Sequence, residues 1–327
     1  MAVRVLFMTM AILQGFAAFA APTVTDVVAK QQYPWNGLVD ITCKVSGIDE
    51  LIENPQFVLS AVLPDSENVR KMSRFWVMRD GVKSSNLAAD ANGDYRLLWD
   101  AKAELGEVRY TNMVVRVTIK GRQKVQLWEG GPYWATTNIG AEKPEDYGYY
   151  FWWGDTIGYK RENDKWVASD GSNLNFSFSS GNTPTYGKDN STLQSEGWIT
   201  ADGVLSPEHD AAQKHWGGDW RMPTKQEFDN LISKCDWTWG SMNGVNGYVI
   251  RGKGDYSSAS IFLPCAGCVY WLSLNFAGSD CFYWSSVPHS DGYSYAWYLR
   301  FGSIFHGTGS DSRYYGQSVR PLQGFTK

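Results

Sequence analysis

The sequence predicts an α+β protein with two domains: a β-sandwich over residues 21–122 and, over residues 123–327, a domain of short strands, two helices and long loops. Two observations lead to this prediction. In the first third of the chain apolar and polar residues alternate, which is the pattern of strands buried on one face. The composition then changes near Gly121, because only three of the 16 tryptophans precede it. Such a shift indicates a domain boundary, and about 300 residues suit two domains.

The first 20 residues have the pattern of a secretory signal peptide. A basic start ends at Arg4, an apolar run follows, and Ala18 and Ala20 place small residues before a cleavage site at Ala21. The run is short for a membrane span, and no later stretch is apolar enough to cross a bilayer. We therefore expect a protein that is secreted or at the cell surface, with no integral membrane segment after signal cleavage.

The charge of the chain argues against a nucleic-acid partner. Lys and Arg number 30 and Asp and Glu 34, so the formal net charge is −4, and no basic run occurs. Binding to phosphate backbones needs clustered basic side chains.

Four stretches predict the strands of the first domain, namely residues 39–45, 57–63, 95–101 and 112–120. The alternation is clearest in the first, where Val39, Ile41, Cys43 and Val45 share one side. The segment "DANGDY" between two of these strands predicts a turn. It also has the Asp-x-Asn-x-Asp start of a calcium loop, but Tyr95 stands where that loop needs glycine. We interpret it as a turn.

Two helices are expected in the second domain. The first covers residues 206–216, with Ser206 as the N-cap and Pro207 at the first helical position. The second begins at a capping box formed by Thr224 and Glu227. It continues with an apolar stripe at helical spacing, made by Phe228, Leu231, Ile232 and Cys235. We expect residues 161–197, which are rich in Asn, Ser and Gly, to be a long loop or flap.

The five cysteines allow a disulfide, since an exported chain meets oxidising conditions. Cys265 and Cys268 have the C-x-x-C spacing of redox and zinc sites, but neither a thioredoxin-like βαβ pattern nor a second C-x-x-C accompanies them. A structural bond from Cys281 to Cys268 or to Cys265 fits better, with Cys268–Cys281 as our hypothesis. Cys235 is expected to be a buried thiol.

Five motifs in order carry a resemblance to a known family. They are "GYYFWWGDT", "GGDWRMPTKQEFDNLI", "IFLPCAGCVYW", "FYWSS" and "YYGQSVRPL". Together they resemble the Fibrobacter succinogenes major paralogous domain, within the formylglycine-generating enzyme and sulfatase-modifying-factor superfamily, a variant of the C-type lectin fold. The resemblance covers residues 125–325 and implies a lectin-like second domain. The stretch "QQYPWNGLVDITCKV" is similar to a β-sandwich (Ig-like) module that precedes such domains in exported bacterial proteins.

The sequence lacks the residues that the known reactions of this superfamily require. Formylglycine-generating enzymes bind copper through two cysteines shortly before the last arginine-containing strand, but Cys281 is the last cysteine of this chain. The three-histidine spacing of related iron enzymes and the calcium-binding triplets of animal C-type lectins are also missing from the sequence. The acidic group Glu142, Glu145 and Asp146 fits a solvated loop better than a catalytic pair. We predict no catalytic residues, no metal site and no cofactor.

An aromatic-rich C-terminal face is the predicted binding site, because large rigid rings among small polar residues are typical of adaptable binding loops. The ligand-binding candidates are Trp271, His289, Tyr293, Tyr295, Tyr298, Phe305, His306 and Tyr314. In this lectin-like fold the same zone is the variable region of proteins that retroelements diversify, and the layout here is similar. We expect a binding or adhesion protein for a glycan or a cell-surface protein. The alternatives are a sulfatase-modifying-factor-like enzyme and a structural component of the envelope.

Overall fold

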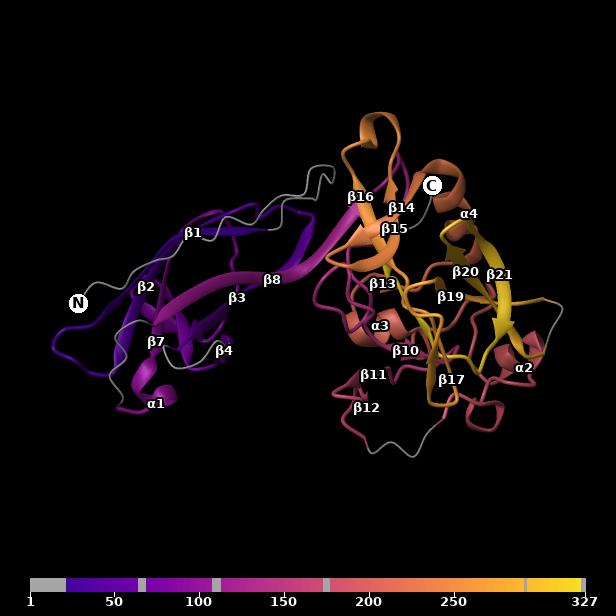
Figure 1. The fold of residues 1–327 in the computed structure, drawn as a ribbon, viewed down its shortest axis with the longest axis horizontal. Helices are drawn as coiled ribbons and strands as arrows, with labels where there is room; N and C mark the ends of the chain where they lie inside the picture. The colour runs from indigo at the N-terminus through magenta and orange to yellow at the C-terminus, as the bar shows by residue number, and fades with distance from the viewer. Residues whose placement is uncertain (1–21, 64–68, 108–112, 173–176, 291–292, 325–327) are drawn as a thin grey trace. The chain divides into compact units, whose positions relative to one another are not determined.

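The computed structural model describes residues 22–63, 69–107, 113–172, 177–290 and 293–324 (Figure 1). The predicted signal peptide, residues 1–20, lies outside these ranges. Within them the chain is mostly β-structure, with several sheets and four short α-helices. The chain divides into two compact units, one up to Gln123 and one from Lys124 onward.

The first unit has two sheets. Its elements are β1 (Thr23–Gln31), β2 (Leu38–Ser46), β3 (Ile52–Val62), β4 (Val69–Met72), β5 (Phe75–Arg79), β6 (Val82–Ser84), β7 (Gly93–Asp100), α1 (Ala101–Leu105) and most of β8 (Val114–Gln126), whose last three residues belong to the second unit. One sheet has the strand order β1-β2-β7-β5-β6. In the other, β3 pairs with both β4 and β8.

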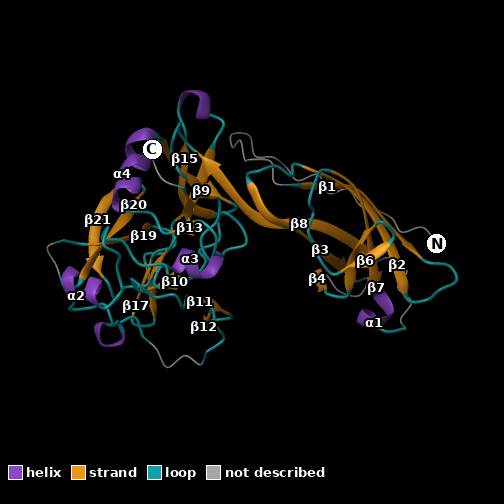
Figure 2. Cartoon of the chain, turned by 180° about the vertical axis from the view of Figure 1, so that it is seen from behind, coloured by secondary structure: helices purple, strands orange, loops and turns teal. Residues whose placement is uncertain are grey.

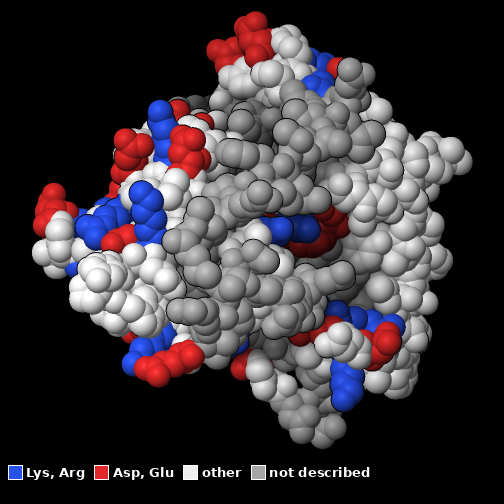
Figure 3. All heavy atoms as spheres, turned by 60° about the vertical axis from the view of Figure 1, so that its left-hand side comes forward, with Lys and Arg blue, Asp and Glu red and all other residues white. Residues whose placement is uncertain are grey.

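One apolar core joins these two sheets. Ile41 of β2 and Leu97 of β7 are buried together with Leu59 of β3 and Val117 of β8. The four strands expected from the alternating pattern are therefore confirmed, because the apolar side of each faces this core. Lys and Arg lie beside Asp and Glu at several places on the face seen in Figure 3. Two ion pairs of the first unit join Arg79 to Asp90 and Arg96 to Asp40.

The second unit is built from short strands joined by many loops (Figure 2). Its first strands are β9 (Tyr133–Ala135), which pairs with the end of β8, β10 (Tyr150–Phe151), β11 (Tyr159–Glu162) and β12 (Lys165–Ala168). Then come η1 (Ser180–Asn182), α2 (Asn190–Ser195), α3 (Ala211–Trp216), β13 (Trp220–Arg221), α4 (Lys225–Lys234), β14 (Asp236–Met242), β15 (Val245–Arg251) and η2 (Gly254–Tyr256). The last elements are β16 (Ser260–Pro264), β17 (Cys268–Tyr270), β18 (Ser273–Asn275), β19 (Asp280–Pro288), β20 (Tyr295–Gly302), β21 (Phe305–Ser312), β22 (Gln317–Ser318) and β23 (Leu322–Gln323).

A seven-stranded sheet forms the centre of this unit, with the order β12-β11-β10-β22-β19-β20-β21. Helix α4 packs on β19, β20 and β21. The predicted capping box is confirmed: Thr224 Oγ1 accepts from the Glu227 backbone N–H at 3.2 Å, and Glu227 Oε2 accepts from the Thr224 N–H at 2.9 Å. Phe228, Leu231 and Cys235 of the stripe are buried.

Two expectations for the second unit are wrong in part. Helix α3 begins only at Ala211, because the carboxylate of Asp210 accepts from two helical N–H groups and is the N-cap in place of Ser206. Residues 161–197 are also more regular than a loop, since they contain most of the β11–β12 hairpin, η1 and α2. Short strands of two to four residues leave little periodicity for sequence reasoning to detect.

No helix in the described part of the chain is long and apolar enough to span a membrane.

Candidate binding surface

Five aromatic side chains from three segments form one partly exposed cluster, which we call the aromatic surface. Its members are Tyr186, Tyr270, Trp271, Tyr314 and Tyr315. Ring centroids lie 5.2 Å apart for Tyr186 and Tyr314 and 5.9 Å apart for Tyr314 and Tyr270. Trp271 follows at 6.3 Å from Tyr270, and its side chain is 55% exposed. Contiguous exposed aromatic patches are unusual on soluble proteins and often mark binding sites.

Trp271 stands at a position in the β17–β18 hairpin that favours glycine. Tyr270 pairs with Ser273, so Trp271 and Leu272 are the two turn residues. Two-residue hairpin turns need a positive φ at their first central position, and Trp271 has a φ of 55°. A bulky residue in this region costs about 1–3 kcal/mol, and such positions are enriched at functional sites.

The hairpin is held on both sides by backbone hydrogen bonds. Trp271 and Phe178 each donate their N–H to the carbonyl of the other, at 2.9 and 3.0 Å. On the other side Val269 and Gly316 exchange the same pair of bonds at 2.7 and 2.8 Å, which places Tyr315 beside Tyr270. Because the backbone is fixed on both sides, little backbone freedom of the hairpin is lost when a ligand binds.

A half-buried tryptophan and a buried phenylalanine support the hairpin turn. Trp166 donates its indole N–H to the carbonyl of Leu272 at 2.9 Å. Phe178 is fully buried, and its ring lies 5.5 Å from that of Tyr159 and 6.4 Å from that of Trp166. The turn therefore rests on packed aromatic side chains.

The buried guanidinium of Arg313 positions the other two segments of the aromatic surface. Its Nη1 donates to the carbonyls of Thr185 and Lys188 at 2.9 and 2.8 Å. These two residues flank Tyr186 in the sequence. Its Nε donates to the carbonyl of Tyr295 at 3.0 Å. The guanidinium also lies 5.0 Å from the ring centre of Trp153, a cation–π distance. Since Tyr314 follows Arg313 directly, these contacts bring Tyr186 and Tyr314 together.

Only part of the predicted face belongs to the aromatic surface. Trp271 and Tyr314 are members of it. Tyr293 and Tyr295 are exposed, and their backbone carbonyls both accept from Arg313, which links their segment to Tyr314.

The remaining four predicted residues are not members of the aromatic surface, although the backbone N–H of His289 donates to the carbonyl of Tyr295 at 3.0 Å. The prediction of Tyr298 as a binding residue is wrong. Its side chain is only 8% exposed, because its ring packs against Phe282 and Trp284 in the core. His289 lies with its ring 4.6 Å from that of Trp297.

Phe305 and His306 are at the far end of the β20–β21 ladder. Gly302 pairs with Phe305 there, whereas Tyr295 begins the ladder opposite Ser312. At about 3.3 Å per residue the two ends are roughly 20 Å apart, so the predicted set does not form one face. The ring of His306 stacks on that of Trp237, with centroids 4.6 Å apart and planes within 3°.

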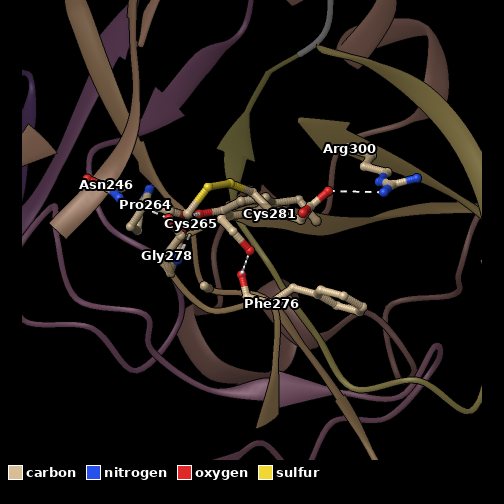
Figure 4. The surroundings of a disulfide bond; sticks show 12 residues. Asn246, Pro264, Cys265, Phe276, Gly278, Cys281 and Arg300 are labelled. Carbon is tan, nitrogen blue, oxygen red and sulfur yellow. Dashed lines mark hydrogen bonds and ion pairs between the residues drawn. A yellow bond between two sulfur atoms is a disulfide. The ribbon is translucent and has the colours of Figure 1, made fainter. Parts of the chain in front are cut away.

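The disulfide joins Cys265 to Cys281, so the hypothesis of a Cys268–Cys281 bond is wrong (Figure 4). Gly267 bridges to Cys281, which brings the two chain segments together. Cys268, the next residue, turns its side chain into the core beside Phe282 and Trp284, and burial raises the pKa of its thiol to about 12. The bond closes the loop that contains the whole β17–β18 hairpin and so fixes the base of the element that carries Trp271.

Three members of the aromatic surface, Tyr186, Tyr270 and Tyr315, are not among the predicted binding residues. Tyr270 and Tyr315 each adjoin a predicted residue, and the doublets Tyr270-Trp271 and Tyr314-Tyr315 were the available signal. Tyr186 has no such signal, because it reaches the aromatic surface only through the contacts of Arg313 with the carbonyls around it.

The acidic residues of the predicted loop have structural partners. Glu145 accepts from the Asn243 side chain at 2.8 Å, and Asp146 accepts from the backbone N–H of Lys143 at 2.9 Å. Nowhere in the described ranges do three His, Cys, Asp or Glu side chains gather as they would around a metal ion.

Comparison of the chain with protein families, with curated proteins and with solved structures finds no match. The functional conclusion therefore depends on the residues of the aromatic surface.

Proposed function

We propose that this chain is a non-catalytic binding protein that recognises its ligand through the aromatic surface. The observation that supports this most is Trp271: a large apolar side chain kept exposed, in a backbone conformation that disfavours it, on a hairpin held on both sides. Folding alone gives no reason to retain tryptophan there, since glycine fits the turn better. A contact that Trp271 makes with a ligand gives such a reason.

In this proposal the first unit is an Ig-like β-sandwich that carries a C-type lectin-like head, and the protein is exported. The two core-sharing sheets of the first unit support the sandwich. The loop-rich second unit and the Cys265–Cys281 disulfide suit an exported, loop-displaying domain.

The arrangement of cysteines supports a non-catalytic role over a thiol-dependent enzyme. Cys265 is consumed in the disulfide, and Cys268 is buried with its pKa raised to about 12. A reactive thiol needs the opposite, an accessible side chain with a lowered pKa.

A panel of glycans and cell-surface proteins, probed with the full chain, tests the proposed function. We expect saturable binding that weakens at least tenfold in Trp271→Ala and does not change in Trp35→Ala. Trp35 is the matched control, because it is a similarly exposed tryptophan in the first unit. A ligand bound equally well by wild type and Trp271→Ala would contradict the proposal.

A further inference from the structure

We infer that the aromatic surface takes one class of ligand, a single chain of a neutral, soluble oligosaccharide, bound without a metal ion. This inference rests on the proposed function and names the ligand of the same site. It follows from the charge, the ring geometry and the size of the surface.

The first argument is charge. The five members of the aromatic surface are four phenols and an indole, and burial raises the pKa of Tyr315 to about 12, so that it stays protonated in the physiological range. Nearby Lys188 is paired with Glu196. The charge of Arg313 is not offered to the surface, because this side chain is fully buried. Since neither of these two described cations is free to compensate an anion, the surface suits a ligand without charge.

The second argument is chemical complementarity. A pyranose ring has an apolar face of C–H groups and a rim of hydroxyl groups. Indole and phenol rings pack against such a face, and tyrosine hydroxyls both donate to and accept from sugar hydroxyls. The aromatic surface supplies both features, and none of its side chains offers a carboxylate or imidazole that a bridging metal ion would need.

The third argument is the orientation of the rings. The planes of Tyr270 and Tyr314 differ by 43°, those of Tyr186 and Tyr314 by 60°, and those of Tyr270 and Trp271 by 82°. Rings that lie flat on a crystalline polymer must be coplanar. Rings turned against one another instead fit a single chain whose successive sugars rotate about their linkages.

The fourth argument is size. A fully buried aromatic side chain hides about 150–250 Å², so these partly exposed rings present on the order of 400 Å². A standard protein–protein interface buries about 800 Å² on each partner. The aromatic surface is therefore small for a protein partner and large enough for a short oligosaccharide.

Calorimetric titration of the full chain tests the inference. The probes are cellohexaose and mannohexaose as neutral ligands, hexagalacturonate as the anionic one, and microcrystalline cellulose in a pull-down assay. We expect a neutral hexasaccharide to bind with an affinity that changes less than twofold on adding EDTA or on raising the salt concentration. Trp271→Ala and Tyr314→Ala should each weaken it at least tenfold, and Trp35→Ala should not.

Each other outcome overturns the inference in a recognisable way. If hexagalacturonate or a surface protein binds, the neutral sugars do not, and Trp271→Ala abolishes that binding, the ligand class is wrong but the proposed function stands. Tighter binding to crystalline cellulose than to cellohexaose would refute the single-chain ligand. If a neutral hexasaccharide binds and neither Trp271→Ala nor Tyr314→Ala weakens this binding, the aromatic surface is not the binding site. No binding of a neutral sugar by the folded wild type refutes the inference, and circular dichroism of each variant shows that loss of binding is not loss of fold.

Discussion

At the scale of single residues, the proposed role of Trp271 sets ligand binding against stability. Its positive φ makes the hairpin less stable than a glycine would, and its ring is exposed where a ligand can reach it. Proteins retain such strain where a ligand or a reaction requires the side chain.

Replacement of Trp271 by glycine should therefore separate the two properties. Trp271→Gly relieves the backbone strain, so the free energy of unfolding should stay equal or rise by about 1 kcal/mol, while ligand affinity falls at least tenfold. Chemical denaturation measures the free energy of unfolding, and titration with the same ligand measures the affinity. Trp271→Ala, which removes the ring but keeps a Cβ at positive φ, is the control and should be less stable than Trp271→Gly. A large loss of stability in the glycine variant would show that Trp271 is retained for packing.

Asp155 is a second residue in an unfavourable environment, because its surroundings disfavour the ionised carboxylate. It follows β10, its Oδ1 accepts from the Ile157 N–H at 2.9 Å, and its buried Oδ2 has no hydrogen-bond partner. Burial raises its pKa from 3.8 to about 7, with a smaller contribution from Asp170.

This raised pKa gives a pH dependence with a defined sign. Between about pH 4 and pH 7 the folded chain holds a proton at Asp155 that the unfolded chain has lost, so this contribution to stability is present at low pH and is lost as pH rises. The slope is at most about 1.4 kcal/mol per pH unit. Asp155→Asn removes the titrating carboxyl group and with it this pH dependence. The stability of the variant relative to wild type should therefore grow from pH 5 to pH 8, because the wild type loses stability over this range. Denaturation curves across this range measure the difference, and the exposed Asp164→Asn serves as control. Parallel curves for wild type and Asp155→Asn would contradict the raised pKa.

At the scale of elements, the β17–β18 hairpin depends on the Cys265–Cys281 disulfide at its base (Figure 4). The bond spans 16 residues of sequence, a separation for which disulfides contribute about 3 kcal/mol.

The double variant Cys265→Ser/Cys281→Ser should lose about this free energy of unfolding and should also bind ligand more weakly, because the hairpin loses its covalent anchor. Cys268→Ala keeps the disulfide and is the matched control, with full binding expected. Peptide mapping of the wild-type chain should find Cys265 linked to Cys281 and free thiols at Cys43, Cys235 and Cys268. A mapped Cys268–Cys281 link would contradict this assignment.

The sequence predicted those elements whose local pattern is strong. Helix α4 has a capping box and an apolar stripe, and β2 has strict alternation, so both were foreseen. The start of α3 was placed too early, because Ser206-Pro207 and Asp210 are both good N-terminal signals. In the structure the carboxylate of Asp210 caps the helix, and Ala211 and Ala212 pack into the core.

The candidate site was harder to predict than the fold. Tyr295 and Tyr298 are three residues apart on β20, so period two places them on opposite faces of the strand, but it leaves open which face belongs to the core; the structure buries the face of Ala296 and Tyr298. The choice between Cys265 and Cys268 depends on which side chain faces the core, which the spacing alone leaves open.

At the scale of the whole molecule, the two units have different means of stabilisation. The first buries alternating aliphatic side chains between two sheets. The second fills the space between its loops with large aromatic side chains and buried arginines, such as Trp153, Trp284 and Arg320. Arg320 donates to the carbonyls of Ala135 and Phe262 and to the Asn138 side chain, so it connects three separate segments. A loop-rich scaffold held in this way can present the aromatic surface without long regular elements.

Hydroxyl-radical footprinting of the full chain, with and without the strongest ligand of the glycan and surface-protein panel, tests the central claim most directly. It reports the oxidation of each exposed aromatic side chain in one experiment, and Tyr33 and Trp35, both exposed in the first unit, are internal controls. Binding at the aromatic surface predicts that the ligand protects Tyr270, Trp271 and Tyr314 and leaves Tyr33 and Trp35 unchanged. If the oxidation of Trp271 is the same in the free chain and in the chain saturated with ligand, the proposed binding site is wrong.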